Sequence, residues 1–239
     1  MKVYLKVELT VVSIHQPVYL PWLGFFKKIS SADIFVLLDD VQYEKNGWQN
    51  RNKIRTKDGD MWLTVPINSK FETNLKDVKI DLSSNWQKKH EKAIYLNYVK
   101  AKNFNVYWND FKKIYDSKFE YLVELNVEII QLLLDKFNIK TKIVFSSEFG
   151  ISAHSSKKLL EICKHLDADE YLSGIAGKEY LVEDEFIENK IQVKYQNFQH
   201  PIYEQVYYPF YPNMAAIDLL YNEGKNAEKI LNESKNFEE

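Results

Sequence analysis

The sequence predicts an α/β protein of Rossmann-like type, with a mostly parallel sheet, helices on both faces and a helical insertion. The first observation is an apolar segment, a helical segment and a second apolar run within the first forty residues. That order is typical of a βαβ unit, in which a crossover helix joins parallel strands. The second is that short apolar runs alternate with helical segments again after residue 140, beyond a long helical stretch. Such alternation favours a parallel sheet.

Residues 1–83 are expected to form the first half of the α/β domain. Residues 7–14 are rich in β-branched side chains and predict a strand, which two prolines end at positions 17 and 21. Residues 23–32 have apolar side chains at helical spacing, and the apolar run 33–38 is typical of a strand buried on both faces. A polar, basic segment (48–57), a strand (61–67) and a short strand (78–82) follow.

Residues 84–140 are expected to form a helical insertion or lobe. Its first part carries Trp86, Ile94 and Tyr98 near helical spacing. Its second part, 116–137, is apolar nearly all round, which indicates a buried helix.

Residues 141–239 are expected to complete the α/β domain with an aromatic C-terminal segment. Ser155 is a plausible N-cap for a helix at 156–166. The remaining expected elements are strands at 142–145, 170–173 and 191–195, a loop at 174–178, a helix or turn at 180–186, a helix at 215–221 and one or two turns at 226–231.

Composition narrows the function. The chain has 32 Lys and Arg against 34 Asp and Glu, a net charge of −2, which argues against a nucleic-acid partner. The single Cys163 excludes an intramolecular disulfide and a multi-cysteine zinc site, and we expect no metal site. Lys6 and Glu8 interrupt the apolar start, and no segment predicts a membrane span, so we expect a cytoplasmic protein.

Two polar pairs follow the first two predicted strands. His15 and Gln16 end the first, and Asp39 and Asp40 end the second. Ligands of parallel sheets bind beyond the carboxyl ends of the strands, so we expect a site there. His15 suits acid–base chemistry near neutral pH, and the aspartates suit a base or a metal ligand. The alternative is structural: a hydrogen-bonded loop histidine and a strand-end or capping pair.

Three further segments are candidate binding sites. Arg51 and its basic neighbours suit an anionic ligand, although a solvated loop is the alternative. The glycine-bearing loop that follows residue 173 is a second, weaker anion candidate. Residues 200–205 resemble residues 15–19 in placing Pro and Tyr after His, which suits stacking on a sugar or base. Packing of an aromatic tail is the alternative for that segment.

The stretch IHQPVYLPWLGFFKKISSADIFVLLDDVQYEKNGWQNRNKIRTKDGDMWLTVPI resembles the N-terminal signature of the WbqC-like protein family. The segments YLSGIAGKEYL and YQNFQHPIYEQVYYPFYPNMAAIDLLYNEG resemble its C-terminal signature. The resemblance implies a bacterial protein of lipopolysaccharide biosynthesis, concerned with O-antigen and other surface glycans. It suggests a transferase that moves an acyl or aminoacyl group to a nucleotide-linked amino sugar. The cofactor and the oligomeric state stay open.

The resemblance and the candidate residues together predict a small-molecule site whose expected catalytic residues are His15, Asp39 and Asp40. The expected substrate-binding residues are Gln16, Tyr19, Trp22, Gln42, Arg51, Asn52, Ser173, Gly174, Lys178, His200, Tyr203 and Gln205. Two other functions stay open: nucleotidyl or adenylyl transfer of the pantothenate-synthetase type, whose opening strand, His-bearing loop and helix are similar, and non-catalytic binding of a sugar nucleotide.

Overall fold

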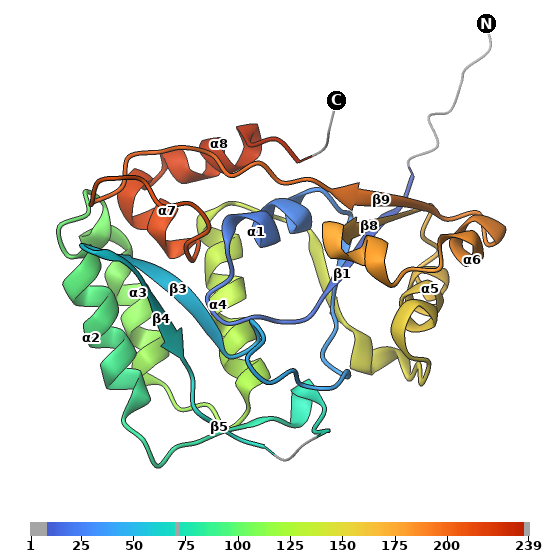
Figure 1. Ribbon diagram of the computed structural model, residues 1–239, viewed down its shortest axis with the longest axis horizontal. Helices are drawn as coiled ribbons and strands as arrows, with labels where there is room; N and C mark the ends of the chain where they lie inside the picture. Colours follow the sequence, from blue (N-terminus) through green and yellow to red (C-terminus); the bar gives the residue numbers. More distant parts are fainter. Residues whose placement is uncertain (1–8, 70–71, 237–239) are drawn as a thin grey trace, which may run out of the picture.

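The structure is a computed structural model that describes residues 9–69 and 72–236. Its centre is a five-stranded parallel sheet, which confirms the Rossmann-like α/β fold (Figure 1). The first two positions of the strand expected at 7–14 lie outside the described residues. In spatial order the strands are β7 (Lys142–Phe145), β2 (Ile34–Leu37), β1 (Val11–His15), β8 (Glu170–Gly174) and β9 (Gln192–Gln196).

Helices cover both faces of the sheet, as expected. Val12 and Ile14 of β1 point to one face, where they pack with buried residues of α5 (Ser155–His165) and α6 (Glu183–Glu188). Phe35 and Leu37 of β2 point to the other face, toward α1 (Leu23–Ser30). Because side chains alternate along a strand, Val36 of β2 points to the first face, so β2 is apolar on both sides, whereas the second face of β1 carries Ser13 and His15.

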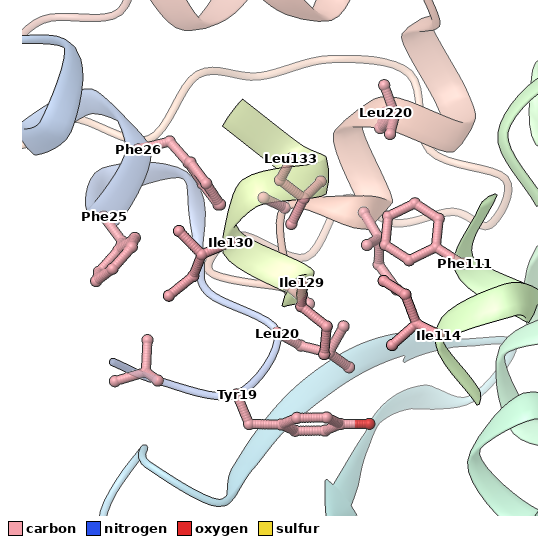
Figure 2. Packing of buried hydrophobic residues seen from close by; sticks show 14 of the residues in the cluster. Tyr19, Leu20, Phe25, Phe26, Phe111, Ile114, Ile129, Ile130, Leu133 and Leu220 are labelled. Carbon is pink, nitrogen blue, oxygen red and sulfur yellow. The ribbon is translucent and has the colours of Figure 1, made fainter. Parts of the chain in front are cut away.

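The helical insertion contains three helices rather than the two expected: α2 (Trp86–Tyr98), α3 (Phe104–Asp116) and α4 (Leu122–Lys136). The two expected parts correspond to α2 and α4, and α3 lies between them. As predicted, α4 is deeply buried. Figure 2 shows its Ile130 and Leu133 between Phe25 and Phe26 of α1 and Phe111 of α3. The insertion therefore shares one continuous core with the sheet.

The polar, basic segment after residue 48 is not a loop. It contributes β3 (Arg51–Thr56), which pairs antiparallel with β4 (Gly59–Thr64) and turns back at residues 57–58. The strand expected at 61–67 is split between β4 and β5 (Ile67–Asn68), and β5 pairs with β6 (Lys79–Ile80). The buried residues of β3 are Asn52, Ile54 and Arg55, and two of the three are polar, so a hydrophobic pattern did not reveal the strand.

Short helical turns follow two strands of the sheet: η2 (Ser146–Phe149) after β7 and η3 (Ile175–Glu179) after β8, where a loop was expected. The predicted N-cap at Ser155 is wrong, since His154 holds that position and Ser155 is the first residue of α5. Another single turn, η1 (Leu75–Asp77), precedes β6. The chain ends in α7 (Ile217–Glu223) and α8 (Asn226–Glu233). Within the described residues, no helix combines the length and apolar character that crossing a membrane requires.

Candidate functional site

A cavity of about 460 Å³ lies beyond the carboxyl ends of β1, β2 and β8. This is where ligands bind in parallel sheets, so the topology and the cavity agree. The lining residues are Ile14, His15, Gln16, Lys28, Leu38, Val41, Gln42, Glu44, Ser155, Lys158, Leu159, Tyr171, Gly174, Ala176, Gly177 and Tyr180.

Lys28 is a buried cation in this cavity. Its side chain comes from α1, it is 2% exposed, and its Nζ donates to the carbonyl oxygen of Ile14 over 3.1 Å. No carboxylate of the described residues forms an ion pair with it. Burial lowers the pKa of Lys28 to about 7. A buried ammonium group without a counter-ion is costly, and an anionic ligand would offset that cost.

The sequence did not single out Lys28. It follows Lys27 in a short helix, and adjacent lysines are usually a solvated surface. The available signal was its place three residues after Phe25, on the buried side of α1.

His15 lies next to Lys28 at the end of β1. Its Nδ1 lies 2.9 Å from the carbonyl oxygen of Gln16, so Nδ1 carries the hydrogen and Nε2 has the free lone pair. The ring contacts Trp22 and Phe25 edge-on, at centroid distances of 5.8 and 5.3 Å. Burial, aided by the charge of Lys28, lowers the pKa of His15 to about 3. The imidazole is therefore neutral near pH 7.

Asp39 and Asp40 lie behind the wall of the cavity, and neither lines it. The carboxylate of Asp39 accepts hydrogen bonds from the backbone N–H of Ser147 at 3.0 Å, from its hydroxyl at 2.7 Å and from the hydroxyl of Ser146 at 3.1 Å. The carboxylate of Asp40 accepts from Ser146 and from Nζ of Lys158, at 2.8 Å for the latter. These bonds attach the loop after β2 to η2 and α5.

A second cavity, of about 890 Å³, adjoins the first. The two share Gln42 and Glu44, which lie on the loop that follows β2. Arg51 is in the second cavity and not in the first. The lining residues are Gln42, Tyr43, Glu44, Lys45, Asn46, Asn50, Arg51, Thr64, Val65, Pro66, Ile67, Ser69 and Glu72.

A row of tryptophans extends from His15 toward Arg51. Trp22 lies 5.7 Å from Trp48, and Trp48 lies 5.4 Å from Trp62, between ring centroids. The guanidinium of Arg51 lies 4.6 Å from the Trp62 ring. The indoles of Trp48 and Trp62 are 46% and 41% exposed, so they present aromatic surface beside both polar sites.

Four of the expected substrate-binding residues lie on or beside the first cavity. Gln16 lines it, and Nε2 of Gln49 donates to Oε1 of Gln16 over 2.6 Å. Gln42 and Gly174 also line it. Ser173 is buried behind Gly174, to whose carbonyl oxygen its hydroxyl donates over 3.1 Å.

The other expected residues are dispersed. Tyr19 is in the core, where its hydroxyl is hydrogen-bonded to His90 and to Tyr115. Asn52 is buried and donates to the carbonyl oxygen of Leu20. Lys178 lies over the ring of Tyr195, at 5.2 Å, in a separate surface depression.

Tyr203 and Gln205 contact the buried Asp218, and neither they nor His200 line either of the two cavities. Tyr203 and Gln205 each donate to Oδ2 of Asp218 over 2.8 Å, and His200 packs against the ring of Tyr203. Burial lowers the pKa of His200. The contacts of this segment are those of an aromatic tail that packs onto the domain.

In the described part of the chain, no group of three or more His, Cys, Asp or Glu residues could hold a metal ion. Cys163 is buried on α5, and burial raises the pKa of its thiol to about 12. The polar side chains that line the first cavity are two ammonium groups, one of them paired with Asp40, a neutral imidazole, two amides, the carboxylate of Glu44 and the hydroxyls of Ser155, Tyr171 and Tyr180. The backbone of a glycine-bearing turn lies beside them.

Comparison with known proteins identifies a matching protein family and a similar protein of known sequence. The model of the WbqC-like protein family matches residues 16–230. An uncharacterized protein of Mycobacterium tuberculosis, Rv1507c, is 32% identical over 224 residues, which are 92% of this chain and 96% of that protein. No solved structure matches the chain.

Proposed function

The chain belongs to the WbqC-like protein family, and we propose that it is a transferase of surface-polysaccharide biosynthesis that acts on a nucleotide-linked amino sugar. The transferred group is an acyl or aminoacyl group, and the acceptor is the amine of the sugar. Family membership supports the pathway, and the first cavity supports the substrate class.

The observation that carries the proposal is the unpaired ammonium of Lys28 in the cavity. A diphosphate would supply the counter-ion that no described residue provides for Lys28, through charge-assisted hydrogen bonds. Gly174 brings bare backbone to the same cavity, which lets a phosphate approach closely, whereas Gly177 makes room for the side chain of Ser173. Tyr171 and Tyr180 give it the apolar and aromatic surface that small-molecule sites need.

His15 is the group that we assign to proton transfer. Its neutral Nε2 can accept the proton that the amine loses as its nitrogen bonds to the acyl carbon. The charge of Lys28 contributes to the low pKa of His15. A diphosphate bound to Lys28 would cancel that contribution and make the imidazole a stronger base. Substrate binding would thus raise the pKa of His15 and make it a better proton acceptor.

Asp39 and Asp40 have positioning roles in this proposal. Their carboxylates are held by Ser146, Ser147 and Lys158, so they fix the loop that presents Gln42 to the cavity. Neither touches the space where the amine would lie.

The test is calorimetric binding of UDP- and dTDP-linked amino sugars, followed by mass analysis with acyl donors. We expect saturable binding that falls at least tenfold in Lys28→Gln. Lys27→Gln is the matched control, because Lys27 is the preceding residue of α1 and its Nζ donates to the carbonyl oxygen of Asn232. Equal affinity in both variants would remove the basis of the proposal.

A non-catalytic sugar-nucleotide-binding module is the second candidate. The structural hydrogen bonds of both aspartates favour it, since they leave His15 as the one expected catalytic residue that lines the cavity. Binding that depends on Lys28, without a mass change for any donor, would support this candidate over the transferase.

A further inference from the structure

Arg51 is a cation in a cavity of its own. It lines the second cavity, together with Tyr43, Asn50 and Thr64, while Lys28 lines the first. No acidic side chain of the described residues forms an ion pair with Arg51. Among the described residues, Lys28 and Arg51 are thus cations without a carboxylate partner, one in each of two adjoining cavities.

The guanidinium of Arg51 is held in place before any ligand binds. It lies 4.6 Å from the ring of Trp62, and its Nη2 donates to the carbonyl oxygen of Asn46. Arg51 and Trp62 belong to the paired strands β3 and β4, where Arg51 is opposite Thr64. Stacking on an indole leaves the edge of a guanidinium available for hydrogen bonds, and a fixed side chain loses less entropy when it binds.

The charged side chains around the second cavity differ in their exposure to solvent. Lys45, Glu44 and Glu72 are exposed, whereas Arg51 is half-buried. Exposed charges are screened by water and salt more strongly than partly buried ones. Arg51 therefore dominates the electrostatics of the inner part, and the cavity suits an anionic group.

We propose that the second cavity is a separate anion site for the co-substrate, and that Arg51 binds a phosphate group of that co-substrate. The inference rests on the proposed function, since a transferase must hold two substrates in contact. Gln42 and Glu44 line both cavities, so the two sites are adjacent, and in this proposal the acyl carbon meets the amine beside these two residues. A guanidinium suits the oxygens of a phosphate, with which it forms paired hydrogen bonds.

The reaction that this arrangement serves is balanced without a redox step. The nitrogen of the sugar amine bonds to the acyl carbon of the donor, and the bond from that carbon to the phosphate-bearing carrier breaks. The carrier leaves with the electron pair, and the proton of the amine passes to Nε2 of His15.

Calorimetric titration of pyrophosphate at pH 6.5 into the full chain tests the inference. We expect two saturable sites in the wild type, one in Lys28→Gln, one in Arg51→Gln and none in the double variant. Lys53→Gln is the matched control and should keep both sites. Lys53 is on the same strand and lies 5.2 Å from the same Trp62 ring, but it lines neither cavity and pairs with Asp60.

The outcomes separate this inference from the proposed function. Loss of one site in Arg51→Gln, with both sites kept in Lys28→Gln, would contradict the Lys28 site and uphold the Arg51 site. A single site in the wild type that survives in Arg51→Gln, or two sites in Arg51→Gln, would overturn the inference. If Arg51→Gln does not fold by circular dichroism, Arg51→Lys decides, since it keeps the charge but should bind at least threefold more weakly at that site.

Discussion

The ammonium of Lys158 lies 2.8 Å from Oδ2 of Asp40, and the two side chains are only 5% and 14% exposed. This ion pair joins α5 to the loop after β2. Lys158 also donates to the carbonyl oxygen of Ile151 over 2.8 Å, so its charge is well satisfied. The pair lies at the wall of the first cavity, and it fixes the shape of that wall.

Removing one partner of this pair should be costly. Lys158→Met leaves the carboxylate of Asp40 buried without its counter-ion, and we expect a loss of about 3 kcal/mol in the free energy of unfolding, measured by urea denaturation. The double variant Lys158→Met with Asp40→Asn should recover part of that loss. The exposed pair Lys229–Glu233 is the control, and its disruption should cost less than about 1 kcal/mol. Additive losses in the double variant would show that the two charges do not interact.

We expect substitution of Asp39 to lower the stability of the fold rather than to remove a catalytic group. Asp39→Ala removes the acceptor of three hydrogen bonds from Ser146 and Ser147, and we expect a loss of about 1–3 kcal/mol in the free energy of unfolding. Ser147→Ala removes one of these bonds and should show a smaller loss, with both variants measured by thermal unfolding. A folded Asp39→Asn that keeps wild-type stability but loses all turnover would instead favour a catalytic carboxylate.

Arg55 links the β3–β4 hairpin to the aromatic segment at residues 200–212. It is fully buried, it donates to the carbonyl oxygens of Gly59 and Pro209 over 2.6 and 2.7 Å, and its guanidinium lies 4.2 Å from the Tyr211 ring. We expect Arg55→Met to cost about 2–4 kcal/mol in urea denaturation and to speed proteolysis between residues 200 and 212. Arg51→Met on the same strand should cost less than about 1 kcal/mol. Equal losses in the two variants would contradict this role.

The sequence predicted the helices and strands whose buried positions are apolar and regularly spaced. The first βαβ unit and the buried helix α4 belong to that class, because their packing is hydrophobic and local. It did not reveal β3, whose buried positions include Asn52 and Arg55. Those side chains are satisfied by partners such as Leu20 and Pro209, and contacts across more than thirty positions leave no local pattern.

The sequence predicted the location of the candidate site better than it predicted the residues that line it. The carboxyl edge of β1 and β2 followed from the topology, and His15 and Gln16 do line the cavity there. Asp39 and Asp40 share that edge but turn toward η2 and α5, because serine hydroxyls and a lysine from later segments meet them. Lys28 was missed because its burial depends on how α1 packs on the sheet.

The titration of Lys28 should give anion binding a characteristic pH dependence. Burial lowers its pKa to about 7, so the free protein loses this charge as the pH rises through neutrality. We expect affinity of the Lys28 site for sulfate, whose own charge is constant in this range, to fall by about thirtyfold between pH 6 and pH 8.5. His15, with a pKa of about 3, should add no slope there. Isothermal calorimetry at a series of pH values measures this effect.

The same group should make stability depend on pH in the opposite sense. Between pH 7 and pH 10.5 the unfolded chain holds the Lys28 proton and the folded chain does not, so the free energy of unfolding should rise with pH across that window. Lys28→Met removes the buried charge, and we expect it to be more stable than the wild type at pH 6, with a gain that shrinks toward pH 9. Lys27→Met should keep the wild-type profile. A Lys28→Met variant that is less stable at pH 6 would show that the ammonium stabilises the free protein.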